Sequence, residues 1–328
     1  MVRRRSATAV AVPLLALVAG CAARTAGTAA RTIPAFTSVA AERRAALESA
    51  GLRAESVAGP AGPLRVFVGG RGPTVVLLHG TGVHAGDWYR VVPALAARYR
   101  LLVPDLPGHG ESVAAEGPIA VADLAAALGA VIEARGGNRA VTLVGNSLGG
   151  WVSLLYAASH PERVERVVGI SSSGIFAQLT VPLRPKDREE ARRLALAIRG
   201  ASAPAASDAE LDAMVASIAA GPGSRLFAGL RAQDFLESHA AAIRTPVDLV
   251  WGDQDGVLPL DYGRRLAGLL PAARFHPLPH CGHMPQVWCP EALAPLLLEI
   301  LAAPPGEAPV EGARDAGSGG SARPLPSL

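Results

Sequence analysis

The sequence is poor in lysine and in aromatic residues, and neither sign of charge dominates it. Lys186 is the only lysine among 31 basic residues, and aromatic residues make up 4% of the chain. No basic stripe interleaved with aromatic residues occurs, so nothing indicates a nucleic-acid partner. Residues 1–20 hold three arginines and no acid, and 31 less three leaves 28 basic residues against 28 acidic ones. Without residues 1–20 the protein is therefore expected to be close to neutral.

The N-terminus has the organisation of a secretory signal. Three arginines precede an apolar run over residues 7–19, which is too short to span a bilayer comfortably as a helix. The run ends in Gly20-Cys21, and "VAGC" resembles the lipobox of bacterial lipoproteins. This resemblance implies lipidation of Cys21 and an exported protein anchored to a membrane of the cell envelope. The alternatives are an ordinary signal peptide, which gives a secreted or periplasmic soluble protein, and an N-terminus that is never cleaved.

Further along the chain, patterns of buried strands alternate with helical patterns. Continuous apolar runs such as "TVVLLHG" (74–80) and "AVTLVGNS" (140–147) are typical of strands buried on both faces. The alternation predicts an α/β fold with a mostly parallel central sheet and helices on both faces. It stops over residues 175–242, where the sequence is helical and a capping box of Ser207 and Glu210 marks a helix start. We expect this insertion to form a helical cap over one edge of the sheet.

These patterns divide the chain into segments of different composition. With 328 residues, 50% of them hydrophobic, the chain has enough apolar material for a large core. The segment after the signal is small and polar, typical of a tether, and the C-terminal segment is low in large apolar residues, typical of disorder. The predicted parts are a signal peptide (1–20), a tether (21–45), an α/β core (46–174 and 243–302), a helical cap (175–242) and a disordered tail (303–328).

One serine lies in the sequence context of a sharp strand-to-helix turn. Gly145-Asn146-Ser147-Leu148-Gly149 follows an apolar strand pattern and opens a helical one. A serine on such a turn points its hydroxyl clear of the sheet, and the helix N-terminus adds positive potential where negative charge develops. We interpret Ser147 as a nucleophile. The alternative is a glycine-rich turn with an idle serine.

The motifs around this serine resemble those of the α/β-hydrolase fold superfamily over residues 60–302. "LLHGTG" (77–82) resembles the oxyanion loop of that family, and "PDLPGHGES" (104–112) resembles one of its turns. "WGDQD" (251–255) resembles the segment with the catalytic acid, and "GHMP" (282–285) the segment with the catalytic histidine. The resemblance implies an α/β-hydrolase fold with a serine-histidine-aspartate triad.

The roles of the triad follow from this resemblance and from the chemistry of serine. A serine hydroxyl is a weak nucleophile until a base takes its proton, and His283 is the expected base. Asp255 is expected to accept from the other ring nitrogen, in the chain order Ser147, Asp255, His283 that this fold uses. Asp253 is the rival acid, for which a structural role in a turn is the default.

The oxyanion that such a reaction forms needs two backbone N–H donors. Leu148, directly after the nucleophile, is expected to supply one, and Thr81 the other, with Gly82 as the alternative to Thr81. His79 and His109 are expected to brace loops rather than react. The other histidines have no companion motif, and of them only His84 is considered for the pocket: His84, His160, His239 and His276.

The stretch "LPHCGHMPQVWC" (278–289) gathers four residues of metal-ligating type, His280, Cys281, His283 and Cys289. Their spacing matches no paired zinc knuckle, and no second ligand pair occurs elsewhere in the sequence, so we expect no metal. The two cysteines are expected either to pair as a disulfide, which export would permit, or to pack as small hydrophobic residues.

The expected function is that of an enzyme, a carboxylesterase that works through an acyl-enzyme and needs no cofactor. The expected partners are a small ester substrate and a membrane, and the cap is expected to set the substrate pocket. "GNSLGGW" and "CGHMPQVW" also resemble meta-cleavage-product hydrolases, which cleave carbon–carbon bonds, although an envelope location favours esters. A binding protein that kept the fold without activity is the alternative of another class.

Overall fold

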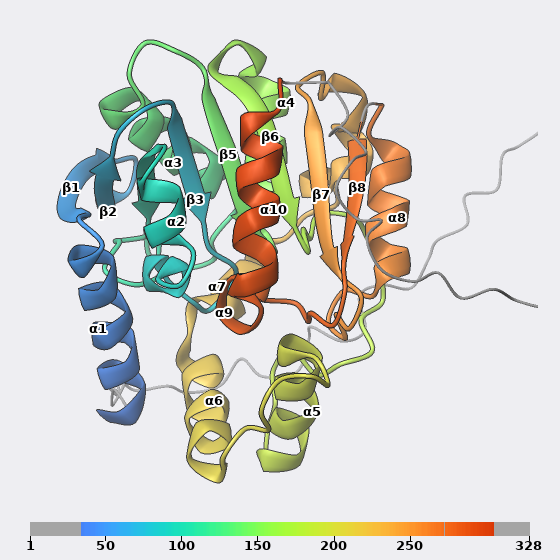
Figure 1. Cartoon of the computed structure of the whole chain (residues 1–328). Helices are drawn as coiled ribbons and strands as arrows, with labels where there is room; N and C mark the ends of the chain where they lie inside the picture. Colours follow the sequence, from blue (N-terminus) through green and yellow to red (C-terminus); the bar gives the residue numbers. More distant parts are fainter. Residues whose placement is uncertain (1–33, 272, 305–328) are drawn as a thin grey trace, which may run out of the picture. The chain divides into compact units, whose positions relative to one another are not determined.

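A computed structural model describes residues 34–271 and 273–304, and these contain one eight-stranded sheet (Figure 1). Its strands are β1 (Arg53–Gly59), β2 (Gly62–Gly70), β3 (Thr74–Leu78), β4 (Arg100–Pro104), β5 (Val141–Asn146), β6 (Val164–Ile170), β7 (Val247–Gly252) and β8 (Ala273–Leu278). The strand order is β1-β2-β4-β3-β5-β6-β7-β8. β2 is antiparallel to both its neighbours, and all pairs from β4 to β8 are parallel. The mostly parallel sheet predicted from the sequence is thus confirmed.

Helices cover both faces of this sheet. They are α1 (Pro34–Ser49), α2 (Val92–Ala96), α3 (Val121–Arg135), α4 (Leu148–Ser159), α5 (Arg188–Arg199), α6 (Asp208–Ala220), α7 (Pro222–Gly229), α8 (Leu260–Leu269), α9 (Pro285–Trp288) and α10 (Pro290–Ala302). Short 3₁₀ turns join them: η1 (Ala85–Trp88), η2 (Pro161–Arg163), η3 (Ala232–Asp234), η4 (Leu236–Ser238) and η5 (Ala240–Ala242).

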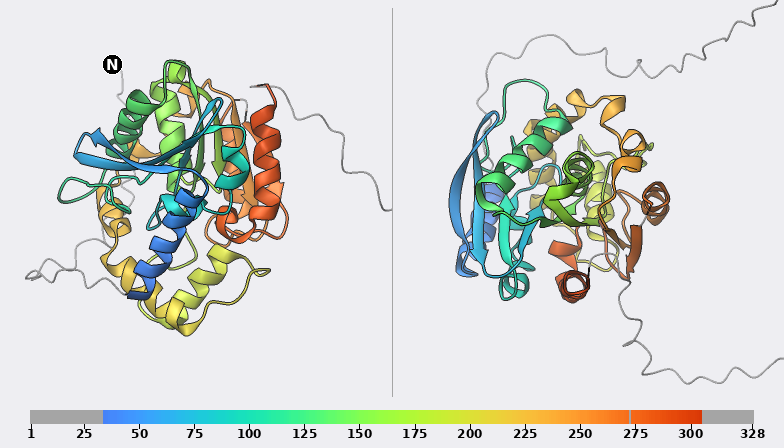
Figure 2. Two further views of the ribbon diagram at one scale, coloured as in Figure 1. Left: turned by 60° about the vertical axis from the view of Figure 1, so that its left-hand side comes forward. Right: turned by 90° about the horizontal axis from the view of Figure 1, so that it is seen from above.

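The two faces of the sheet bury separate hydrophobic clusters, because successive side chains of a strand point to opposite sides. Val75 and Leu77 of β3 belong to the cluster that α2 and α10 cover. Val76 and Leu78 belong to the cluster that α3, α4 and α8 cover. The view from above in Figure 2 shows these helices on either side of the strands. The apolar run of β3 is continuous because its side chains are buried on both faces of the sheet.

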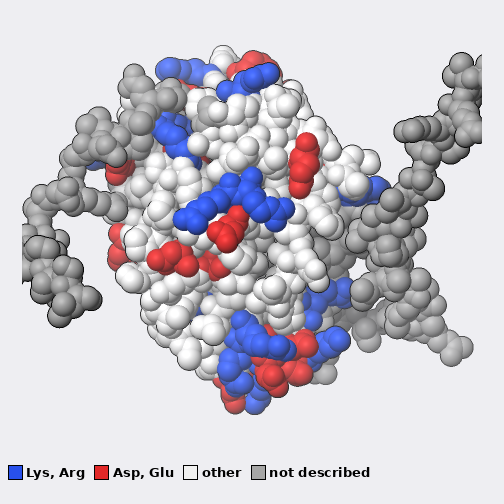
Figure 3. All heavy atoms as spheres, turned by 90° about the vertical axis from the view of Figure 1, so that its right-hand side faces the viewer, with Lys and Arg blue, Asp and Glu red and all other residues white. Residues whose placement is uncertain are grey.

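The cap consists of helices and turns, and the described residues of 175–242 contain no strand. The side chain of Ser207 accepts from the backbone N–H of Glu210, and the Glu210 carboxylate accepts from that of Ser207, so the predicted capping box is confirmed. Arg188 of α5 pairs with Asp208 and Asp212 of α6 at 3.0 and 2.5 Å. Figure 3 shows basic and acidic side chains interspersed at the bottom of the molecule, where Figure 1 places α5.

The N-terminal boundary of the folded region differs from the one that composition suggests. Composition predicts a tether over residues 21–45 that can become helical near its end, and in the structure residues 34–45 belong to helix α1. The helix is held to the sheet by Leu47, which is fully buried, and by ion pairs described below. The predicted signal peptide and Cys21 lie outside the described residues, as does the predicted tail from residue 305 onward. None of the helices within the described residues is long and apolar enough to cross a membrane.

Candidate active site

Ser147 lies on a strained turn between β5 and α4. Its backbone has φ 53° and ψ −115°, a conformation that non-glycine residues rarely adopt and that tends to persist at functional sites. The turn brings the two elements into backbone contact: a Cβ on Gly145 would lie 2.3 Å from the carbonyl carbon of Gly149. Ser147 itself stays partly exposed. The turn predicted from the G-x-S-x-G pattern therefore presents this side chain at the carboxyl end of the sheet.

His283 and Asp255 form a buried hydrogen bond beside this turn. The ring Nδ1 of His283 lies 2.9 Å from Asp255 Oδ2, and the two residues are 6% and 5% exposed. The other oxygen of Asp255 accepts from the backbone N–H groups of Val257 and Leu258 at 2.9 and 2.8 Å. Because the carboxylate only accepts, Nδ1 carries the proton and Nε2 has a free lone pair. In the described part of the chain, Ser147 makes no side-chain hydrogen bond to His283, a contact that is often long until substrate binds.

Asn146, the residue before Ser147, connects the serine turn to the histidine loop. Its side-chain amide donates to the backbone carbonyls of His283 and Ile170, at 2.9 and 3.1 Å. Its oxygen accepts from the fully buried amide of Gln286 at 3.0 Å. In "GNSLGG" the G-x-S-x-G pattern assigns roles to the glycines, Ser147 and Leu148, but none to Asn146. In the sequence, Asn146 and Gln286 are only two polar residues within apolar motifs, and nothing there indicates that their side-chain amides form a hydrogen bond.

The last turn of α5 also contacts both loops of the site. The carbonyl of Ile198 accepts from the backbone N–H of His283 at 2.8 Å, and that of Ala197 accepts from Gly256, next to Asp255, at 3.1 Å. Gly282 permits this approach, since a Cβ there would lie 2.5 Å from the backbone nitrogen of Gly200. The cap is thereby joined to the histidine and aspartate loops through backbone groups, which no side-chain motif encodes.

The predicted oxyanion donors Leu148 and Thr81 belong to two segments that adjoin Ser147. Leu148 is the first residue of α4, where a backbone N–H has no partner within the helix. Thr81 follows Gly80, at which a Cβ would lie 3.3 Å from the Cβ of Ser147. The cap helix α7 lies above this loop, since a Cβ on Gly223 would be 3.1 Å from Thr81 Cγ2. Leu148 is thus next to Ser147 and Thr81 is next to a residue that adjoins it, and the prediction that their N–H groups receive an oxyanion stays a prediction.

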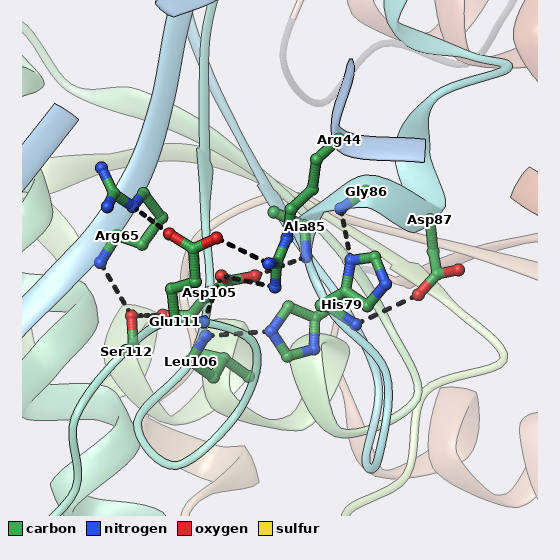
Figure 4. A network of polar contacts seen from close by, with 11 residues as sticks. Arg44, Arg65, His79, Ala85, Gly86, Asp87, Asp105, Leu106, Glu111 and Ser112 are labelled. Carbon is green, nitrogen blue, oxygen red and sulfur yellow. Dashed lines mark hydrogen bonds and ion pairs between the residues drawn. The ribbon is translucent and has the colours of Figure 1, made fainter. Parts of the chain in front are cut away.

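The histidines next to this loop are buried and held neutral. Burial lowers the pKa of His79 to about 4 and that of His109 to about 3. The Nε2 of His79 accepts from the backbone N–H of Leu106 at 2.9 Å (Figure 4). The Nδ1 of His79 therefore carries the proton and donates to the carbonyl of Gly80 at 2.8 Å. Burial also lowers the pKa of His84, whose Nδ1 accepts from a backbone N–H. These contacts are those of bracing residues.

The remaining residues of the 278–289 stretch have structural contacts. Cys281 and Cys289 form a disulfide with their Cα atoms 5.9 Å apart, which answers the question that the sequence leaves open. The carboxylate of Asp253 accepts from the backbone N–H of His280 at 2.7 Å and so shapes the loop before His283. The described residues contain no group of three or more side chains suited to hold a metal.

The geometry can be compared with known proteins. A family model described as "alpha/beta hydrolase fold" matches residues 73–290. That range is more than half of the chain, and the protein therefore belongs to the α/β-hydrolase fold family.

Its relatives act on different substrates. The chain is 30% identical over 256 residues to a 2-hydroxy-6-oxo-6-phenylhexa-2,4-dienoate hydrolase of Burkholderia cepacia, covering 71% of this chain and 89% of that one. It is 32% identical over 234 residues to a pimeloyl-[acyl-carrier protein] methyl ester esterase of Chromobacterium violaceum, covering 66% and 89%. A crystal structure of a membrane phospholipase A aligns with a TM-score of 0.70 and 29% identity over 81% of this chain and 91% of that one. The shared class is that of hydrolases.

Proposed function

We propose that this protein is a serine hydrolase that cleaves carboxylic esters through Ser147, His283 and Asp255. The observation that carries the proposal is the buried hydrogen bond between His283 and Asp255, on loops joined by Asn146 to the strained turn of Ser147. A base with a fixed tautomer, on a loop joined to the turn of a partly exposed serine, supports the activation of that serine as a nucleophile.

In the acylation step, His283 Nε2 takes the proton of Ser147 as its oxygen attacks the ester carbonyl carbon. The carbonyl oxygen becomes negative and receives hydrogen bonds from the N–H groups of Leu148 and Thr81, each worth about 2.7–4 kcal/mol of the barrier. Asp255 stabilises the imidazolium that forms. His283 then gives its proton to the leaving alcohol oxygen, the carbon–oxygen bond breaks, and an acyl-serine remains.

In the deacylation step, a water molecule replaces the alcohol. His283 takes one of its protons while the water oxygen attacks the acyl carbon, and the same two N–H groups receive the oxyanion. Collapse of the intermediate returns the proton to Ser147 and releases the carboxylic acid. No step needs a metal or an organic cofactor.

The proposal is tested by ester turnover. We expect the wild-type protein to hydrolyse p-nitrophenyl acetate and butyrate, and Ser147→Ala to reduce turnover to the rate without protein. Ser159→Ala, at the exposed far end of α4, serves as the matched control and should retain full activity. Equal turnover by wild type and Ser147→Ala would exclude the triad mechanism.

Carbon–carbon cleavage is the competing reaction, supported by the dienoate hydrolase among the relatives. Loss of the absorbance of a 2-hydroxy-6-oxo-dienoate, faster per active site than any ester in a chain-length series, would favour it. Because one relative is a membrane phospholipase A, the ester series should include phosphatidylcholine vesicles. Faster hydrolysis of these vesicles than of short esters would identify phospholipid esters as the substrate class.

We further propose that the protein is exported and anchored through a lipidated Cys21. The tripartite pattern of residues 1–20 and the "VAGC" sequence support this. Several acyl chains on one residue hold a protein firmly, because each buried CH₂ contributes about 0.8 kcal/mol. Mass spectrometry of the membrane fraction should find a modified Cys21 as the first residue, and any other mature N-terminus would refute the anchor.

A further inference from the structure

Helix α1 lies outside the residues that the family model matches, yet it reaches the loop that carries Thr81. The match begins at residue 73, and α1 spans Pro34–Ser49. Two adjacent arginines of this helix, Arg43 and Arg44, pair with two carboxylates that are each only 1% exposed, Asp87 and Asp105. Both carboxylates hold backbone N–H groups of the segment that follows Thr81.

Asp87 fixes the backbone at His84. One of its oxygens accepts from the backbone N–H of His84 at 3.1 Å, and the other pairs with Arg43. The guanidinium of Arg43 also lies 5.5 Å from the centre of the Tyr89 ring. Among the described residues, Arg43 is the only basic side chain paired with Asp87.

Asp105 fixes the backbone at Ala85, the residue after His84, and also the turn at Glu111 (Figure 4). Its Oδ1 accepts from the backbone N–H of Ala85 at 2.8 Å, and its Oδ2 accepts from that of Glu111 at 2.8 Å. Arg44 lies 3.5 Å from Oδ2 and donates to the Glu111 carboxylate at 2.7 Å. No other basic side chain in the described ranges pairs with Asp105.

The loop between these fixed points contains the predicted oxyanion donor. His79 holds one end through Leu106, and the two carboxylates hold the other end at His84 and Ala85. Between them, a Cβ on Gly82 would meet no heavy atom within 4 Å, so packing there does little to fix the backbone. The position of the Thr81 N–H therefore depends on how firmly the two ends are held, in addition to the contact of the Thr81 side chain with Gly223 of α7.

We propose that Arg43 and Arg44 are positioning residues for the oxyanion loop, so that the N-terminal helix is a working part of the catalytic apparatus. The proposal rests on the function proposed above. An unpaired buried carboxylate is costly, and the cost is relieved when the carboxylate moves toward water. With either arginine neutralised, Asp87 or Asp105 would move, and the loop would lose the contacts that place Thr81.

The decisive variant is Arg44→Met in the full chain, compared with Arg135→Met. Arg135 makes a similar 2.7 Å pair with Glu55, which ties α3 to β1 away from the loop. Outright loss of an oxyanion donor costs roughly 10²–10³ in rate, so a displaced donor should lower kcat/KM per titrated active site by about tenfold or more. The inhibition constant of a trifluoromethyl ketone, which forms a tetrahedral adduct with serine, should rise by the same factor while KM stays nearly constant. Arg135→Met should change neither value.

Two further variants separate positioning from simple loss of stability. Arg44→Lys keeps the charge and should restore most of the activity. Glu111→Gln removes the charge of the other carboxylate that Arg44 contacts but keeps the pair of Arg44 with Asp105, and it should leave kcat/KM nearly unchanged. If Arg44→Met lowers only the melting temperature, and leaves kcat/KM per active site and the inhibition constant unchanged, α1 is merely a structural staple and the proposal is wrong.

Hydrogen exchange gives a readout that does not depend on activity. In Arg44→Met, the backbone amides of residues 81–87 should exchange faster than in the wild type, and in Arg135→Met they should not. A wild-type protein without esterase activity would overturn the proposed function but leave this comparison to decide whether α1 holds the loop. Unchanged exchange in Arg44→Met would overturn the positioning role, whatever the activity.

Discussion

The two oxygens of the Asp255 carboxylate have different partners, and this difference makes a single-atom test possible. Oδ1 accepts from two backbone N–H groups, those of Val257 and Leu258, while Oδ2 accepts from His283. In Asp255→Asn the amide oxygen must take the place of Oδ1, because an NH₂ group there would face two donors. The NH₂ group then points at His283 Nδ1 and forces the proton onto Nε2.

Asp255→Asn should therefore lower kcat for p-nitrophenyl butyrate by roughly 10³- to 10⁴-fold, the scale of a lost tautomer in a serine triad. The fold should be retained, since the substitution changes no volume. Asp253→Asn is the matched control, because the Asp253 carboxylate accepts from the backbone N–H of His280 and makes no hydrogen bond to His283 within the described residues. Comparable losses in the two variants would mean that the assignment of the acid is wrong.

The buried histidines predict how stability depends on pH. The pKa of His109 is lowered by burial to about 3, while in the unfolded chain it is about 6.5. Between these values the unfolded chain binds a proton that the folded chain does not, so the free energy of unfolding decreases as the pH falls from about 6.5.

His109→Asn keeps a donor for the carbonyl of Pro107, which the ring Nδ1 approaches at 3.1 Å, but removes the titration. The slope of unfolding free energy against pH between pH 6 and 4 should then be smaller than in the wild type by up to about 1.4 kcal/mol per pH unit. Urea titrations at three pH values measure it. Parallel curves for the two proteins would show that His109 is not held neutral.

Among the secondary-structure elements, the start of the cap is attached to α8 by one hydroxyl. Tyr262, 6% exposed, donates to the carbonyl of Ile175 and accepts from its N–H, both at 2.9 Å. Burial raises the pKa of Tyr262 to about 12, so the hydroxyl remains a donor at neutral pH. The point where the chain leaves β6 for the cap is thus closed by a reciprocal pair of hydrogen bonds.

Tyr262→Phe should lower the free energy of unfolding by about 1–3 kcal/mol, because it leaves two buried backbone groups without partners. Tyr156→Phe is the control: Tyr156 is equally buried, and its hydroxyl has no hydrogen-bond partner in the described part of the protein. Urea denaturation of both variants measures the difference, and equal values would contradict the role given to Ile175.

The sequence predicts those elements well that a continuous apolar run or a motif defines. β3, β5 and β7 are buried on both faces, and their continuous apolar runs predict them. β1 has only Val57 buried among its residues, so no alternation marks it as a strand. α1 is held by paired arginines and by the single buried Leu47 rather than by an apolar stripe, and arginines in a small, polar segment resemble those of a tether.

In the candidate site, too, motifs predict some residues, and contacts without a motif cannot be predicted. The motifs locate Ser147, His283 and Asp255, and the structure brings the last two into contact. The contacts of Ile198 and Ala197 use backbone carbonyls, which any residue type provides, and so leave no trace in the sequence. The bridge through Asn146 joins residues 137 positions apart, and one sequence does not reveal which of its polar side chains meet at that distance.

At the scale of the whole molecule, the topology gathers the site from segments far apart in sequence. The loops after β3, β5, β7 and β8 meet at the carboxyl edge of the sheet, where α/β proteins place their ligands. The cap and α1 both contact these loops, although neither belongs to the sheet. The disulfide of Cys281 and Cys289 closes the histidine loop.

The central claim is that His283 and Asp255 activate Ser147, and covalent labelling tests it most directly. The full chain is treated with a fluorophosphonate, which reacts only with activated serines, and the adduct is located by peptide mass spectrometry. We predict a single adduct on Ser147, none in Ser147→Ala, and much slower labelling in Asp255→Asn than in Asp253→Asn. A folded wild-type protein whose Ser147 stays unmodified, or whose adduct lies on another residue, would contradict the claim.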